Sequence, residues 1–200
     1  MLVIAMETGA PPGGRRRWAG RRHDDDRPDA SSGSSAAELF DSVFHALHDG
    51  EQVALGFDCP LTLPVSVGQG AAAGHADADA LVKLAEPAAT QPGITELGQV
   101  LGELGTWRPW TTVSTSLERW KANTSILVWQ AVPAPGSGGV TASAAADSFF
   151  RQLPAVTGRG REPGAGPVVN LAAAAARRAG LFVDPSELAR PTLSITVTGA

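Results

Sequence analysis

The apolar residues of this chain form two kinds of pattern, and the two alternate along the sequence. Short continuous runs rich in β-branched residues predict buried strands at 2–7, 53–57 and 125–129, and an alternating pattern predicts a last strand at 193–197. Spacings of three and four residues predict helices at 36–48, 95–104, 117–121, 141–153 and 170–179. Strands that alternate with helices indicate an α/β domain with parallel strand pairing.

Two of these helices carry end signals. Ser35 precedes the helix at 36–48 and Glu38 follows three residues later, which is the pattern of a capping box. Gly180 follows the alanine-rich helix at 170–179 in the position of a C-terminal cap. These signals support both helices independently of their apolar spacing.

The remaining stretches are polar or rich in small residues. A basic cluster at 15–22 is followed by an acidic one at 24–29, and a second strand or hairpin arm fits in this region. The serine-rich residues 31–35 predict a polar loop. The Ala/Gly-rich stretch at about 64–92 predicts a loop-rich insert, and 158–167 predicts a flexible loop.

Length and composition further limit the possible fold and function. The 200 residues, 43% of them hydrophobic, predict a single domain over 1–200 that buries a core without disulfides. One cysteine, Cys59, excludes an internal disulfide framework and a multi-cysteine metal site. The formal net charge of −4 argues against a globally basic nucleic-acid coat protein but allows a local basic patch. The abundance of small residues is typical of a high-GC bacterial genome, such as that of an actinobacterium.

The sequence shows no sign of membrane insertion or export. No segment reaches the ~18 consecutive apolar residues of a transmembrane helix. The opening residues 1–6 lack a preceding positive region and are followed at once by Glu7, unlike a signal peptide. We therefore expect a cytoplasmic protein with no membrane partner.

Two carboxylates stand at predicted strand ends, Glu7 after the first strand and Asp58 after the strand at 53–57. In open α/β sheets, ligands bind beyond the carboxyl ends of parallel strands. If the two strands are neighbours, these carboxylates share one crevice and could hold Mg²⁺ or Mn²⁺, which would activate water against a phosphodiester. Alternatively, Asp58 caps the turn at Cys59–Pro60 and Glu7 is only a polar strand end.

The same residues carry a family resemblance. Glu7 after one apolar strand, and the segment Gly56-Phe57-Asp58-Cys59-Pro60-Leu61 after another, resemble a bacterial domain-of-unknown-function family of predicted nucleases. Segments 126–131, 149–150 and 170–172 are similar too. The resemblance implies an RNase H-like fold, a mixed sheet flanked by helices, and metal-dependent hydrolysis of nucleic acid with Glu7 and Asp58 as catalytic metal ligands.

One part of the family pattern is missing. The resemblance implies a further acid at the start of the late helix, but residues 140–144 contain no carboxylate. Asp147, about one turn farther along that helix, is the candidate third metal ligand. Without a third ligand the metal site is incomplete, which favours a degenerate nuclease or a fold reused for other chemistry.

The basic cluster supplies candidate substrate-binding residues. Arginines near a metal site can clamp phosphates bidentately, and a tryptophan can stack on a base. On this interpretation the contacts to nucleic acid come from Arg15, Arg16, Arg17 and Trp18. The alternative is a solvated loop whose charge is offset by the acidic run at 24–29.

A different class of function also fits the sequence. Four tryptophans are expected to pack the middle of the domain: Trp107, Trp110, Trp120 and Trp129. If they line an apolar pocket, the chain is a small-molecule enzyme or binding protein of bacterial secondary metabolism. Cys59 is expected to be buried and inert, since a nucleophilic cysteine needs a base such as histidine. A non-catalytic partner protein is the third possibility.

Overall fold

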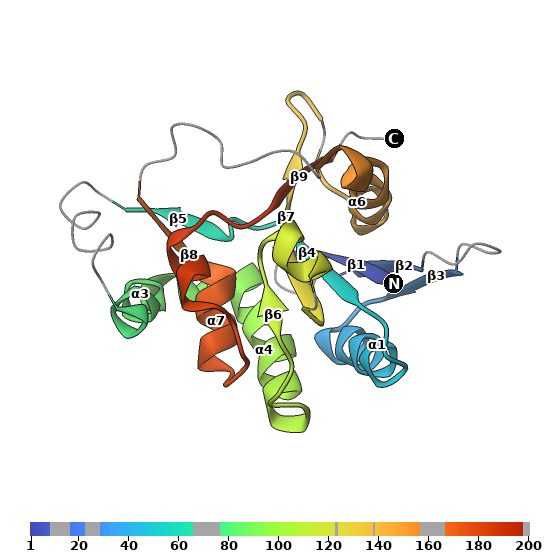
Figure 1. Cartoon of the computed structure of the whole chain (residues 1–200). Helices are drawn as coiled ribbons and strands as arrows, with labels where there is room; N and C mark the ends of the chain where they lie inside the picture. Colours follow the sequence, from blue (N-terminus) through green and yellow to red (C-terminus); the bar gives the residue numbers. More distant parts are fainter. Residues whose placement is uncertain are drawn as a thin grey trace.

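A single mixed β-sheet forms the centre of the molecule in the computed structural model (Figure 1). The structure describes residues 1–8, 17–22, 29–65, 77–122, 124–137, 139–156 and 167–197. The strand order is β3-β2-β1-β4-β7-β6, and β9 also pairs with β7. The strands are β1 (Leu2–Glu7), β2 (Arg17–Arg22), β3 (Asp29–Gly33), β4 (Val53–Phe57), β6 (Val113–Ser114), β7 (Ile126–Pro133) and β9 (Ser194–Val197).

The strand directions decide where the ends of the strands meet. β2 runs antiparallel to both β1 and β3, whereas β4 is parallel to β1 and to β7, and β6 and β9 are parallel to β7. The carboxyl ends of β1 and β4 therefore lie at one edge of the sheet, which we call the carboxyl edge. The register places Met6 beside Phe57, so the residues that follow them reach this edge at the same level.

Helices cover both faces of the sheet, and alternate residues of β1 point into two different cores. Leu2, Ile4 and Met6 belong to the larger core, whose helices are α1 (Ala36–His48), α3 (Ala78–Leu84), α4 (Pro92–Trp107) and α7 (Leu171–Arg178). Val3 and Ala5 belong to the smaller core, which α5 (Leu117–Lys121) and α6 (Ala142–Val156) complete. Figure 1 shows α6 across the sheet from α1 and α4.

A second, two-stranded sheet and a buried polar network attach the C-terminal part of the chain. β5 (Thr62–Pro64) pairs antiparallel with β8 (Val168–Asn170). Buried Asn170 donates to Thr115 Oγ1 at 2.8 Å, and buried Glu187 accepts from the Oγ1 of the same threonine at 2.7 Å. Glu187 belongs to the 3-10 helix η2 (Pro185–Ala189), so one threonine after β6 joins β8 to η2. A further 3-10 helix, η1 (Glu86–Thr90), lies between α3 and α4.

The apolar patterns located the main elements. Strands at the four predicted positions and helices at the five predicted positions are confirmed, within a few residues at their ends. The capping box of Ser35 and Glu38 is present, and Gly180 has a φ of +73°, which suits its position after α7. The α/β class with a mixed sheet flanked by helices is likewise confirmed.

Three expectations differ from the structure. Residues 31–33, expected in a loop, belong to β3. This strand has no apolar pattern in its sequence, and its pairing with β2 holds it in the sheet. In the predicted insert at 64–92, residues 78–84 and 86–90 are helical, and 66–76 lie outside the described residues. Trp107 and Trp110, expected in the core, are 62% and 70% exposed.

None of the helices in the described part of the chain is both long and apolar enough to span a membrane. The predicted flexible loop at 158–167 falls almost wholly outside the described residues.

Candidate functional site

Glu7 and Asp58 lie together at the carboxyl edge. Glu7 ends β1, and Asp58 directly follows the neighbouring parallel strand β4, where its backbone N–H donates to Met6 O at 3.4 Å. The negative charge of Glu7 is one of the influences that raise the pKa of Asp58, so the two carboxylates interact electrostatically. The structure thus brings together the two acids that the sequence singled out.

Thr8 fixes one oxygen of Asp58. Both the backbone N–H and the Oγ1 of Thr8 donate to Asp58 Oδ1 at 2.5 Å. Burial is the largest influence on this carboxyl and raises its pKa, while the hydrogen bonds from Thr8 lower it. The net direction is upward. Both hydrogen bonds from Thr8 reach Oδ1, and among the described residues no hydrogen bond from another residue reaches Oδ2.

Glu7 has a second task besides its place at the strand end. Its Oε1 accepts the backbone N–H of Ala142 at 2.9 Å, the first residue of α6. A carboxylate at a helix N-terminus satisfies an otherwise unpaired N–H and interacts favourably with the helix dipole. Within the described residues, Oε2 of Glu7 accepts no hydrogen bond, so Glu7 also offers one oxygen to a ligand.

Asp147 does not join these two carboxylates. It is 49% exposed and pairs with Arg21 Nε at 3.0 Å, and Arg21 also donates to Ser143 Oγ. Arg21 lies opposite Val3 in the β1–β2 register, four residues before Glu7, which corresponds to roughly 13 Å along the strand. Asp147 therefore ties α6 to β2. The described residues contain no group of three histidine, cysteine or acidic side chains that could hold a metal ion.

The candidate substrate-binding residues have different positions. Arg15 and Arg16 lie outside the described residues. Arg17 is exposed and stands directly opposite Glu7 in the register, close to the carboxyl edge. Trp18 is only 4% exposed and belongs to the larger core, because strand alternation turns it toward the α1 side of the sheet. Its buried ring offers no face to a base, contrary to the expectation of stacking.

Further residues at this edge were not predicted as parts of the site. A Cβ placed on Gly93, at the start of α4, would meet both Cys59 Sγ at 2.4 Å and Thr8 Oγ1 at 2.8 Å. The first turn of α4 therefore packs on the carboxyl edge. Glu96, just beyond that turn, is 1% exposed, and its charge is one influence on the Cys59 thiol. In the sequence, Glu96 stands out only as an acidic residue beside the apolar positions of α4, which does not indicate that it lies near the site.

Cys59 is buried, as the sequence predicted. It is 8% exposed, and burial raises the pKa of its thiol to about 11. Because the thiolate is the nucleophilic form, a thiol with this pKa is unreactive at neutral pH.

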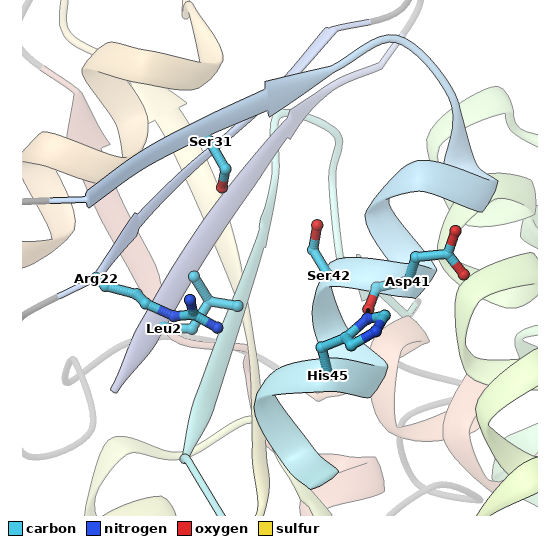
Figure 2. Close-up of a pocket in the computed structure, with 6 residues that line it drawn as sticks. All are labelled: Leu2, Arg22, Ser31, Asp41, Ser42 and His45. Carbon is cyan, nitrogen blue, oxygen red and sulfur yellow. Dashed lines mark hydrogen bonds between the residues drawn. The ribbon is translucent and has the colours of Figure 1, made fainter. Parts of the chain in front are cut away.

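The four tryptophans do not gather around one apolar pocket in the described part of the chain, since two fill the smaller core and two are exposed. Trp120 and Trp129 are buried against Phe149, with ring centroids 6.2 and 5.0 Å from it, and fill the smaller core. A hollow of about 250 Å³ between α1 and the strands (Figure 2) is lined by Leu2, Arg22 and polar side chains, at the far end of β1 from Glu7. It contains no tryptophan.

No protein-family model, no curated protein and no solved structure matches this chain with significance.

Proposed function

We propose that this protein is a metal-dependent phosphodiesterase of RNase H-like type that acts on nucleic acid. The observation that carries the proposal is the pairing of Glu7 and Asp58 at the carboxyl ends of neighbouring parallel strands, each with one oxygen that accepts no hydrogen bond from another described residue. This edge of an α/β sheet is where ligands of such folds bind.

The order of the strands supports the RNase H-like part of the proposal. Three consecutive antiparallel strands are followed by a helix, and β4 then returns parallel to β1, with β7 beside it. A mixed sheet flanked by helices is also what the resemblance of the segment Asp58-Cys59-Pro60-Leu61 implies. The strands β6 and β9 extend that sheet beyond β7.

The donor set fits a hard divalent cation. Mg²⁺ is commonly held by one or two carboxylates, with waters and substrate phosphates as its other ligands, and Glu7 Oε2 with Asp58 Oδ2 supplies two carboxylates. A nearby cation favours the ionised form of Asp58 and so opposes the effect of burial. When bound, the ion would polarise a phosphoryl oxygen and lower the pKa of a water molecule.

The surrounding residues orient these two acids. Thr8 holds Oδ1 of Asp58, and the Ala142 N–H holds Oε1 of Glu7, so each side chain is fixed through the oxygen that the ligand does not need. Arg17, exposed and opposite Glu7, is the described arginine placed to bind a phosphate of the substrate.

The missing third acid favours a second candidate within the same fold. With Asp147 engaged by Arg21, the site offers two carboxylates, and a site of this kind is also expected in a degenerate nuclease that binds nucleic acid without cleaving it. The small-molecule alternative is not supported by a shared tryptophan pocket, because Trp120 and Trp129 fill the core while Trp107 and Trp110 are exposed.

The test combines metal binding with cleavage. Thermal unfolding of the full chain is followed with and without MnCl₂, and labelled single-stranded and double-stranded DNA and RNA serve as substrates. We expect Mn²⁺ to raise the Tm, because a ligand at 100 times its Kd increases the free energy of unfolding by about 2.7 kcal/mol. Glu7→Gln and Asp58→Asn should abolish both this shift and cleavage, whereas Glu103→Gln, which changes an exposed acid on α4, should preserve both.

The outcomes separate the candidates. A metal shift without cleavage in the wild-type protein favours the degenerate nuclease. Full Mn²⁺-dependent cleavage by either site variant, or the absence of any metal shift in the wild-type protein, contradicts the proposed site.

A further inference from the structure

A groove of about 520 Å³ lies at the opposite edge of the sheet from Glu7 and Asp58. Its lining includes Gln52 and Ser125, which immediately precede β4 and β7, and Thr111, which lies two residues before β6. Because these strands are parallel, this is their amino edge, about 17 Å from the carboxyl edge for a five-residue strand such as β4. The volume falls within the range of small-molecule sites.

The groove is lined by cations that have no acidic partner there. Arg108 is partly exposed and lines the groove, and its Nη1 has no hydrogen-bond partner among the described residues. Lys121 is exposed, and no ion pair involves it in the described part of the chain. The one acid in the lining, Glu51, is occupied by the N-terminal ammonium at 3.2 Å and by Arg22 Nε at 3.1 Å. The groove therefore carries positive charge suited to an anion.

The same groove presents an aromatic ring. Trp110 lines it and is 70% exposed, an unusual degree for the largest apolar side chain. Beside it the amide of Gln52 is fixed, because its Nε2 donates to Trp120 O at 2.9 Å and to Thr124 O at 3.3 Å. An exposed ring beside two cations is the combination that binds a base by stacking and its phosphate by charge.

We propose that this groove binds one nucleotide unit, with the base stacked on Trp110 and the phosphate at Arg108 and Lys121. The unit is either a free nucleotide or part of a single strand, since both present the same chemistry. This site is distinct from the carboxyl edge, needs no metal, and goes beyond the hydrolytic function proposed above.

The test measures binding in EDTA, so that the carboxyl edge contributes no metal-dependent signal. Fluorescence anisotropy follows a labelled decathymidylate on the full chain, and unlabelled thymidine monophosphate serves as competitor. We expect saturable binding that Trp110→Ala and Lys121→Ala each weaken about tenfold or more. Competition by the monophosphate identifies a free-nucleotide site, and binding of the decamer alone identifies a site for a strand.

Matched controls separate the groove from general surface effects. Trp107 is 62% exposed but does not line the groove, and Lys83 on α3 is the other lysine of the chain. Trp107→Ala and Lys83→Ala should leave the affinity unchanged, and so should Glu7→Gln, which disables only the proposed hydrolytic site.

Three results would overturn the proposal. The first is the absence of saturable binding by the wild-type protein. The second is an equal loss of affinity in Trp107→Ala and Trp110→Ala. The third is a dimer in sedimentation experiments that Trp110→Ala dissociates, because the exposed tryptophan would then belong to an interface between copies of the chain.

Discussion

Asp58 experiences two opposing influences on its charge. Burial disfavours the carboxylate, while the two hydrogen bonds from Thr8 stabilise it, and burial dominates, so the pKa is raised. A carboxylate that is held ionised against its surroundings destabilises the folded state at neutral pH. Such residues are expected at functional sites, where a group needed for chemistry is kept although it lowers the stability of the folded state.

Asp58→Asn should therefore make the protein more stable at pH 7. Asparagine keeps an oxygen that can accept from Thr8 but carries no charge to bury. The folded pKa of Asp58 lies above its unfolded value, so the destabilisation appears as pH rises through the interval between the two. Denaturant titrations at several pH values should show a gain near neutrality that disappears below pH ~4.

The corresponding control is Asp41→Asn, which changes an exposed acid on α1 and should show no such pH-dependent gain. A loss of stability in Asp58→Asn at pH 7 would mean that the hydrogen bonds from Thr8, rather than burial, dominate this carboxyl.

Glu7 combines a structural and a proposed catalytic task, and two substitutions separate them. Glu7→Gln keeps an amide oxygen for the Ala142 N–H, whereas Glu7→Ala removes the acceptor from the start of α6. We expect Glu7→Ala to lower the free energy of unfolding by about 1 kcal/mol, as for loss of a helix cap, and Glu7→Gln to lower it much less. Denaturant unfolding measures the difference, and equal losses would show that the stabilisation of α6 depends on the negative charge of Glu7 rather than on an acceptor oxygen alone.

At the scale of elements, α4 packs tightly against the C-terminal end of α7 at Gly105. A Cβ at this position would lie 1.9 Å from Ala179 O, a backbone atom that cannot rotate away. Gly98 and Gly102 belong to the same helix, but a Cβ there would meet nothing within 4 Å. The three glycines therefore differ in their surroundings while sharing one helix.

We expect Gly105→Ala to destabilise the protein by about 1–3 kcal/mol, because α4 and α7 must separate to admit the methyl group. Gly98→Ala and Gly102→Ala should instead stabilise it by about 0.5–1 kcal/mol, since alanine favours the helix. Thermal unfolding of the three variants checks both signs, and a neutral Gly105→Ala would contradict the close packing of these helices.

The elements that the sequence predicts are those whose signal is local. β1 and β4 are continuous apolar runs because helices cover both faces of the sheet, and α1 has its capping box beside it. β3 carries no such pattern, since its sequence Asp29-Ala30-Ser31-Ser32-Gly33 is polar and only the partner strand makes it a strand. The short strands β5, β6 and β8 likewise depend on partners far away in sequence.

The same distinction applies to the site. Glu7 and Asp58 lie together because β1 and β4 are parallel neighbours. The alternation of strands and helices in the sequence already predicts such parallel pairing. The position of Asp147 does not, because its partner Arg21 lies 126 residues away in sequence. The burial of Trp18 depends on which face of β2 packs on α1, and no apolar alternation in Arg17–Arg22 indicates that face.

At the scale of the whole molecule, the reactivity of Cys59 can report how often α4 separates from the sheet. This cysteine is the only thiol of the chain, lies at the carboxyl edge and is covered by the first turn of α4. Its reaction with a thiol reagent requires both the thiolate and access to the sulfur. The two requirements are met together when α4 separates from the sheet, so the rate reports how often this happens.

We expect the native protein to react with a disulfide reagent far more slowly than the unfolded chain. A pKa of about 11 in place of 9.0 lowers the thiolate fraction at pH 8 by about 100-fold, from about 10% to about 0.1%, before any effect of access. The 8% exposure of Cys59 lowers the rate further.

Gly105→Ala, which strains the packing of α4, should increase the native rate but leave the rate in denaturant unchanged. Spectrophotometric release of the reagent's thiol measures both rates, with Cys59→Ala as the blank. A native rate equal to that of the unfolded chain would show that α4 does not protect the carboxyl edge, and the geometry from which we infer the Glu7–Asp58 site would then be wrong in solution.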